Sequence, residues 1–589
     1  MSVDSKQTGA SHTRVENLIT EHMDIWTSAI KRKSSSGRGS SKKIDLYGIK
    51  KLRELILELA VRGKLVPQDP SDEPASVLLE RIAQEKGQLV KDGKIKKPKT
   101  LPEIRDAEKP FELPQGWEWD RLGELGYTQT GGTPNKNKTE YFGAHIPFIK
   151  PGDILERKVD YSNEGLSLIG EESLGRSAPK GSILMVCIGT IGKCAYIDRK
   201  CAFNQQINSI TPYLEITDFL IKALSASYFQ NLSWSLSAST TIAIINKGKW
   251  ESIPVVLPPL QEQHRIVAKV DELMALCDEL EAQTESSLDA HQTLVTVLLD
   301  TLVNSQNADE LTENWTRLSA HFDTLFVTED SIDQLKQSIL QLAVMGKLVS
   351  QDPNDEPASV LLERIAAEKA QLIKDKKIKK QKPLPPINDD EKPFELPTGW
   401  EWVRFGNVVI CRLGKMLDKA KNTGSLLPYL RNTNVQWDRF ILDDIKLMKL
   451  EESELQEFRI LPGDLLICEG GEPGRCAIWI EAELEMYFQK ALHRARPLAG
   501  VQSKYLQLCL TVDAKTGVLD NYFTGATIKH FVGAKLNNYI HSLPPLEEQY
   551  RIVAKVDELM ALCDQLKAQL TSIKQTQLHL ADTLVAQAL

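Results

Sequence analysis

Several features that would assign this chain to a class of protein are missing from its sequence. No uninterrupted apolar run approaches the roughly 18 residues that a membrane-spanning helix needs. The first residues lack the basic stretch and apolar run of a secretory signal, which predicts a cytoplasmic protein. The nine cysteines include no CxxC pair, which favours reduced thiols over disulfides or a zinc site.

The motifs that carry catalysis or nucleotide binding are missing too. The nearest approach to a phosphate-binding GxxxxGK[ST] loop is GTIGKC at 189–194, which has two intervening residues where four are needed. The chain contains no GxGxxG and no HExxH. It also lacks the NPPY or DPPY tetrapeptide with which DNA adenine methyltransferases grip a flipped base. The sequence therefore predicts a chain with no catalytic site, metal or cofactor of its own.

The net charge of −8 argues against a protein that coats nucleic acid without regard to sequence, because that mode needs many Lys and Arg residues to neutralise phosphates. The acidic excess is uneven along the chain. Residues 116–256 hold 14 Lys and Arg against 14 Asp and Glu, and residues 399–541 hold 18 against 17. These two segments are close to neutral, so the overall charge does not exclude local contact with DNA.

The sequence contains a long internal repeat. DEPASVLLERIA at 72–83 and GWEW at 116–119 both recur 283 residues later, and RIVAKVDELMALCD at 265–278 recurs unchanged 286 residues later. Between these blocks the two copies diverge almost completely, with faint echoes such as GSILMVCIGTIGKCAYI at 181–197 and GDLLICEGGEPGRCAIWI at 463–480. The pattern predicts a preserved frame that carries two inserts of one fold with different surfaces.

The frame is predicted to be helical and the inserts to be rich in sheet. Apolar residues recur at three-to-four spacing between Leu52 and Leu65, and Pro74 stands near a second helix start. The basic runs at 91–102 and 374–386 then end this helix in both copies, and we interpret them as solvated linkers, with phosphate contact as the alternative. The inserts show short β-branched and aromatic runs separated by Gly, Pro and Asn, which is typical of strands and turns.

The last block of each copy is predicted to be one long helix with a coiled-coil seam. A helix over 259–302 would be roughly 65 Å long, so its apolar seam needs a partner, and the obvious partner is the other copy. Antiparallel packing of the two would relate the copies by a pseudo-two-fold axis. The main members of the first seam are Ile266, Val270, Leu273, Cys277 and Leu280, and Leu294 and Leu298 continue it. The main members of the second seam are Ile552, Val556, Leu559, Cys563 and Leu566.

Together these patterns predict an α+β chain in which two sheet-containing domains are joined by two long helices that form an antiparallel coiled coil. Residues 1–50 are predicted to hold one helix, around Val15 to Ile30, and a flexible basic linker. The remaining order is a helical repeat region (51–110), a first domain (111–257), a central coiled-coil helix with connector (258–333), a second helical region (334–393), a second domain (394–543) and a C-terminal coiled-coil helix (544–589).

The repeated residues resemble the signature of a known family, the specificity subunits of type I restriction-modification enzymes. The resemblance rests on LRELILELAVRGKLVPQDP at 52–70, on TGGTP at 130–134 after GWEW, and on PPLQEQHRIVAKVDEL at 258–273. It covers nearly all of residues 45–589, twice, and the N-terminal extension is similar to the type IB group. The second domain departs from it, because CRLGKM at 411–416 stands where the first has TGGTP.

The resemblance implies a DNA-reading function and a set of partners. Each of two target recognition domains would read one half of a split, asymmetric site in double-stranded DNA. The helical regions would bind two methyltransferase subunits and associate with restriction subunits that act as DNA motors and nucleases. S-adenosylmethionine, ATP and Mg²⁺ would be bound by those partners and not by this chain.

Contacts to DNA are predicted from polar and basic residues at matching places in the two domains, because Lys and Arg can bind phosphate or guanine while Asn and Gln can pair with adenine. For each of them an ordinary surface role is the alternative. The candidates in the first domain are Thr133, Lys136, Lys138, Lys150, Asp153, Gln205, Gln206, Thr240, Thr241, Lys247 and Lys249. Those in the second domain are Lys415, Lys419, Arg431, Asn434, Gln489, Lys490, Arg494, Thr527, Lys529 and Lys535.

Two other functions remain open at this point. A stand-alone two-headed DNA-binding protein would bind DNA tightly without partners, whereas a specificity subunit alone would bind weakly or aggregate because its helical faces are bare. An enzyme with an unrecognised site would turn over substrate in isolation.

Overall fold

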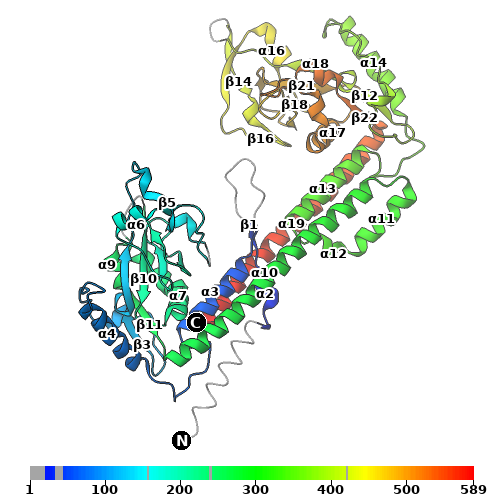
Figure 1. Ribbon diagram of the computed structural model, residues 1–589. Helices are drawn as coiled ribbons and strands as arrows, with labels where there is room; N and C mark the ends of the chain where they lie inside the picture. The colour runs from blue at the N-terminus through cyan, green and yellow to red at the C-terminus, as the bar shows by residue number, and fades with distance from the viewer. Residues whose placement is uncertain (1–19, 33–43, 156–157, 238–241, 419–421) are drawn as a thin grey trace. The chain divides into compact units, whose positions relative to one another are not determined.

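The computed structural model describes residues 20–32, 44–155, 158–237, 242–418 and 422–589, which belong to two compact units (Figure 1). The first unit consists of Met1–Leu288 and Ser572–Leu589, and the second of Asp289–Thr571. Two long helices contribute residues to both units, α10 (Leu260–Val303) and α19 (Leu546–Ala588). Within the described ranges, no helix is both long enough and apolar enough to cross a membrane.

The N-terminal segment of the first unit packs on helix α3 (Tyr47–Val61). It contains α2 (Met23–Ser28) and a two-stranded sheet of β1 (Lys31–Arg32) and β2 (Ile44–Asp45). The Trp26 side chain of α2 is fully buried in the core of this unit. Within the described part of the predicted helix around 15–30, α2 covers Met23–Ser28, and the first two residues of the predicted flexible linker form β1. Residues 1–19 and 33–43 of that prediction lie outside the described ranges.

The first part of α10 packs in this unit with α3 and with the end of α19. The five predicted seam residues of α10, Ile266 to Leu280, are all buried. Their core cluster includes Leu52, Leu55, Ile56 and Leu59 of α3 and Ala581 and Leu584 of α19. The expectation that each seam packs on the other copy was thus incomplete, because the short amphipathic helix α3 also offers an apolar face to this seam.

The described residues of the first domain form three small sheets. β3 (Glu118–Arg121) pairs with β11 (Pro254–Leu257), which joins the start of the domain to its end. A four-stranded antiparallel sheet has the order β4 (Gly126–Thr130), β10 (Ile207–Pro212), β7 (Ile183–Val186) and β8 (Cys194–Tyr196). A three-stranded sheet has the order β6 (Gly165–Leu166), β5 (Phe142–Ile149) and β9 (Ala202–Phe203), with β5 and β9 parallel.

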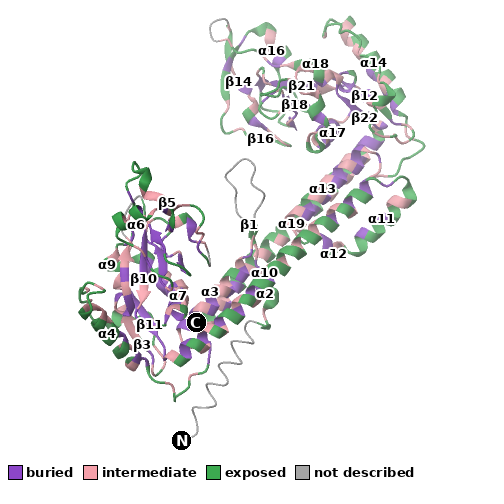
Figure 2. Ribbon diagram, in the orientation of Figure 1, coloured by how far each residue is buried: buried purple, intermediate pink, exposed green. Residues whose placement is uncertain are grey.

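Helices cover these sheets and connect them to the frame. All four residues of β7 are buried, whereas α4 buries only Ala75, Leu78 and Ile82 and exposes its outer face (Figure 2). The helices of the helical region and the first domain are α4 (Ala75–Lys91), α5 (Leu122–Leu125), α6 (Leu168–Leu174), α7 (Thr217–Ser225), α8 (Ser227–Ser235) and α9 (Lys247–Glu251).

The second unit repeats the same helical arrangement. Its α13 (Glu329–Val344) corresponds to α3 and packs with the first part of α19 and the end of α10. Ile552, Val556 and Cys563 are buried, while Leu559 and Leu566 are half-buried. Leu294 of the predicted seam is 50% exposed, so that part of the prediction was wrong. The other helices of this frame are α11 (Ala308–Ala320), α12 (Phe322–Leu325) and α14 (Ala358–Lys374).

The second domain has the topology of the first. β12 (Glu401–Arg404) pairs with β22 (Ile540–Leu543), and the four-stranded sheet has the order β13 (Val409–Leu413), β21 (Leu492–Pro497), β18 (Leu465–Cys468), β19 (Cys476–Ile478). The three-stranded sheet has the order β17 (Lys446–Leu450), β14 (Ser425–Leu430), β20 (Tyr487–Phe488). The remaining elements are α15 (Phe405–Val408), β15 (Val435–Gln436), β16 (Arg439–Phe440), α16 (Glu452–Phe458), α17 (Ser503–Thr516) and α18 (Gly533–Asn538). The matching sheet orders confirm the prediction of one fold in both domains.

Candidate nucleic-acid interface

The loops at one end of the four-stranded sheet come together in the first domain, and we call this the loop end. β4 ends at Thr130, β7 ends at Val186 and β10 begins at Ile207, and these three strands are neighbours in the sheet. Gly131 N donates a hydrogen bond to Ile207 O at 3.0 Å, and Gly132 N donates to Phe203 O at 3.0 Å. The loop after β4 and the turn between β9 and β10 are therefore fixed to each other by backbone hydrogen bonds.

The second domain repeats these contacts atom for atom. Gly414 N donates to Leu492 O at 3.0 Å, and Lys415 N donates to Phe488 O at 3.1 Å. The turn itself is held in the same way in both domains, because Asn204 N donates to Ile149 O and its equivalent Gln489 N donates to Leu430 O. These matched bonds make Gly132 equivalent to Lys415, and Gln205 equivalent to Lys490.

A close backbone approach explains why glycine precedes the loop in both domains. A Cβ atom on Gly131 would lie 2.1 Å from Asn204 O, and one on Gly414 would lie 2.2 Å from Gln489 O. Both neighbouring atoms belong to the backbone and cannot rotate away, so a side chain at either position would displace the turn.

The opposite end of each domain is joined to the frame by the repeated sequence blocks. Trp117 Nε1 of the GWEW block donates to Glu262 Oε2 of α10 at 2.9 Å, and Trp400 Nε1 donates to Glu548 Oε2 at 2.9 Å. Both carboxyl groups are 1% exposed, and burial raises the pKa of Glu262 to about 7. An ion pair stands beside each: Arg265 Nη2 to Asp72 Oδ2 at 2.5 Å, and Arg551 Nη2 to Asp355 Oδ2 at 2.6 Å.

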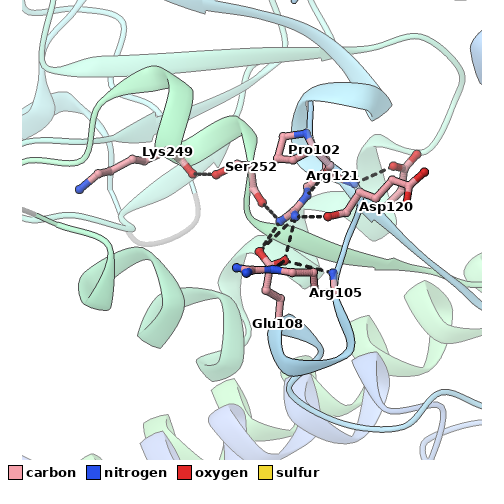
Figure 3. A network of polar contacts seen from close by, with 8 residues as sticks. Pro102, Arg105, Glu108, Asp120, Arg121, Lys249 and Ser252 are labelled. Atoms are coloured by element: carbon pink, nitrogen blue, oxygen red, sulfur yellow. Dashed lines mark hydrogen bonds and ion pairs between the residues drawn. The ribbon is translucent and has the colours of Figure 1, made fainter. Parts of the chain in front are cut away.

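A buried arginine fixes the end of each basic run. The Arg121 guanidinium of β3 donates to Pro102 O at 3.0 Å and to Glu103 O at 2.9 Å, and also contacts Glu108 and Ser252 O (Figure 3). In the second unit, Arg404 binds Pro385 O, Pro386 O and Glu391, and donates to Asn538 O. The lysines of the basic runs are exposed, but the chain after them is held against the domain rather than free, which corrects part of the linker interpretation.

Comparison with known proteins decides the family. A family model described as the type I restriction modification DNA specificity domain matches residues 114–290 and again residues 397–575. The EcoAI type I restriction enzyme specificity subunit of Escherichia coli is 43% identical over 98% of this chain and 100% of its own length. The chain belongs to the type I restriction enzyme specificity subunits.

Two further similar proteins can be named. The EcoEI specificity subunit of Escherichia coli is 42% identical, again over 98% of this chain and 100% of its own. A crystal structure of the HsdS subunit from Thermoanaerobacter tengcongensis covers 82% of this chain and 98% of its own, at 19% identity and a TM-score of 0.41.

The loop end of the first domain carries several of the predicted DNA contacts. Thr133, Lys136, Lys138 and Gln205 are exposed there, and the Thr133 hydroxyl donates to Gln205 Oε1. Gln206 is half-buried, and Lys150 forms an ion pair with Glu164.

The predicted lysines of α9 lie apart from this group. Lys247 pairs with Glu251 at 2.8 Å, and Lys249 Nζ donates to Leu236 O at 2.9 Å. Thr240, Thr241 and, in the second domain, Lys419 lie outside the described residues.

In the second domain, Lys490, Thr527, Lys529 and Lys535 are exposed. Lys529 forms an ion pair with Asp520 at 3.0 Å, and Lys415 pairs with Glu454. Gln489 is half-buried, and Arg431 pairs with Asp444 at 2.7 Å. Only some of the predicted DNA-contact residues are thus exposed and not already paired with an acidic residue of the protein.

Three predicted contacts have a structural role instead. Asp153 accepts from Lys150 N at 2.8 Å, and Asn434 Oδ1 accepts from Arg431 N at 2.9 Å, so each caps the short turn after β5 or β14. Arg494 is 6% exposed and donates through Nη1 to two backbone carbonyls; its burial lowers the pKa of the guanidinium to about 10. Because all three side chains are buried, the prediction that they touch DNA is corrected.

Sequence reasoning missed the residue that shapes the turn of the first domain. Asn204 Oδ1 accepts from Gln206 N at 2.9 Å, which is the local side-chain hydrogen bond of an Asx-turn. The signal was the Asn that stands directly after the Ala202–Phe203 strand, although the strand was too short to recognise from its pattern. Among the described residues, no three His, Cys, Asp or Glu side chains lie together as metal ligands would.

Proposed function

We propose that this specificity subunit is the non-catalytic DNA-reading chain of a type I restriction-modification complex, in which each loop end reads one half of a split, asymmetric DNA site. One observation carries the proposal: two domains with matched backbone hydrogen bonds present different exposed side chains at the same place. Since base edges are read by side chains and the backbone sets only their position, two such domains suit two different half-sites.

The frame supports a scaffolding role. Each domain is joined to its long helix by the same Trp–Glu hydrogen bond, and the same Arg–Asp ion pair stands beside it within the frame, so a partner that recognises one copy of the frame can recognise the other. We therefore propose two methyltransferase subunits as partners, with restriction subunits completing the complex. S-adenosylmethionine, ATP and Mg²⁺ would bind to those subunits, and the complex would act on DNA in the cytoplasm.

The proposal is tested by purifying the chain together with candidate methyltransferase subunits and mapping adenine methylation on plasmid DNA by single-molecule sequencing of modified bases. We expect methylation at one split motif. Exchange of residues 117–256 for the corresponding segment of another specificity subunit should change one half of that motif and leave the other half as it was. Exchange of residues 400–541 should do the converse.

Two outcomes would contradict the proposal. If the chain forms no complex and directs no methylation, yet binds one DNA sequence tightly by itself, it is a stand-alone DNA-binding protein. If an exchange of one domain changes both halves of the motif, the two domains do not read separate half-sites.

A further inference from the structure

The turn between β9 and β10 presents one side chain at its apex, and this residue differs between the domains. In the first domain the turn is Asn204, Gln205 and Gln206, and in the second it is Gln489, Lys490 and Ala491. The backbone bonds described above place Gln205 and Lys490 at the same position of the same turn. Both side chains are exposed.

Gln205 is the side chain of its turn that remains available for a ligand. Asn204 and Gln206 are hydrogen-bonded to each other: Gln206 N donates to Asn204 Oδ1 at 2.9 Å, and Asn204 Nδ2 donates to Gln206 Oε1 at 3.3 Å. The Thr133 hydroxyl donates to Gln205 Oε1 and so orients the amide. A carbonyl oxygen has a second lone pair, so the oriented amide can still accept one hydrogen bond and donate two.

Lys490 offers a cation at the equivalent place. Its backbone N donates to Lys415 O at 2.8 Å, which fixes the apex of the turn. The neighbouring ammonium of Lys415 is neutralised by Glu454. No hydrogen bond or ion pair joins the Lys490 ammonium to any residue that the structure describes.

The change from an amide to an ammonium on an unchanged backbone distinguishes base reading from phosphate binding. The sugar-phosphate backbone is the same at both half-sites, so a position that only contacts phosphate gains nothing from such a change, and a neutral amide neutralises no phosphate. A base edge does change between half-sites. In the major groove, Gln matches the N6 donor and N7 acceptor of adenine, and Lys matches the O6 and N7 acceptors of guanine.

We propose that Gln205 and Lys490 are equivalent specificity-determining residues, with Gln205 reading an adenine in one half-site and Lys490 reading a guanine in the other. This inference rests on the proposed function, because it requires that the loop ends read DNA. It assigns one base of each half-site, and it predicts that exchanging Gln and Lys between the two protein positions exchanges the bases that they read.

The experiment uses the full chain in complex with its methyltransferase subunits and a plasmid library in which every position of the parental motif is varied. Gln205→Lys should change the preference at one position of one half-site from adenine to guanine, by roughly tenfold to a hundredfold, and Lys490→Gln should do the reverse in the other half-site. The matched controls are Gln115→Lys and Lys449→Gln, which make the same changes at exposed positions away from the turn and should leave the motif as it was.

Each result decides the matter. If Gln205→Lys and Lys490→Gln lower the methylation of every sequence by the same factor and change no base preference, the two residues contact phosphate or only support the turn. The inference is then wrong. The inference is wrong too if Gln205→Ala and Lys490→Ala, in complexes that still elute intact, leave every position of the motif equally selective. If the parental complex methylates no split motif, it is the proposed function that fails.

Discussion

At the scale of single residues, the contact between the first domain and its long helix contains a buried carboxyl group. Glu262 accepts a hydrogen bond from Trp117 Nε1, while its Oε1 has no partner among the described residues. Burial raises its pKa from 4.5 to about 7, against the opposing effects of Trp117 and Arg265. Between these two pH values the unfolded chain releases a proton that the folded chain keeps, so this group makes the fold less stable as pH rises from about 4.5 to 7.

Glu262→Gln keeps the acceptor for Trp117 and removes the titration. We expect the free energy of unfolding of this variant to vary less with pH over that window, and to exceed that of the parent above pH 7 by up to about 3 kcal/mol. Denaturant unfolding at several pH values measures both effects. Glu272→Gln, at an exposed position of the same helix, controls for the loss of one negative charge. Parallel pH profiles for Glu262→Gln and the parent would mean that this carboxyl is not the group that titrates.

The buried guanidinium of Arg121 gives a second prediction at this scale. Arg121→Ala leaves three backbone carbonyls without their donor, so we expect it to lower the free energy of unfolding by about 2–4 kcal/mol. Arg105 also bonds to Glu108 but its side chain is 83% exposed, and Arg105→Ala should change stability by less than about 0.5 kcal/mol. Equal losses in the two variants would show that the shared Glu108 contact, and not the carbonyls, carries the effect.

At the scale of elements, the loop end depends on the approach of two turns. Gly131→Ala places a methyl group against a backbone oxygen of the β9–β10 turn, whereas a methyl group on Gly152 of the same domain would have no atom within 4 Å. We expect Gly131→Ala to cost about 1–3 kcal/mol of stability and to weaken methylation that depends on the first half-site. Gly152→Ala should leave both unchanged. The measurements are denaturant unfolding and methylation of a plasmid that carries the parental site.

The elements also show how far sequence reasoning reached. The repeat predicted the frame, both domains and the long helices, because identical blocks such as GWEW must fold alike and because an apolar seam has a fixed period. It did not predict that α3 covers the seam, since periodicity shows which face is buried but not what buries it. Among the candidate DNA contacts, Thr133, Gln205 and Lys490 were chosen by residue type and are exposed, and their contact with DNA stays a prediction. Arg494 was chosen in the same way but is buried, because residue type alone does not show whether a cation is exposed.

At the scale of the whole molecule, the two units pack their frame helices in the same way and leave some apolar residues of the long helices exposed. In each, a short frame helix, α3 or α13, shares a core with the start of one long helix and the end of the other. The apolar residues that this packing leaves in solvent include Leu294 and Val297 of α10, which are 50% and 55% exposed. Three residues apart on one helix, they form a single apolar face, and such faces mark surfaces for association.

We expect this face to be covered by a partner subunit, so the double substitution Leu294→Glu and Val297→Glu should reduce co-elution with the methyltransferase subunits at least tenfold. Neither residue is part of the buried core, which is why circular dichroism and denaturant unfolding of the isolated chain should be unchanged. Ile480→Glu, at a position of the second domain that is 75% exposed, is the matched control and should keep the complex intact. Undiminished co-elution of the double variant would place the partner on another surface of the frame, whereas loss of the complex in the Ile480→Glu control would place it on the second domain.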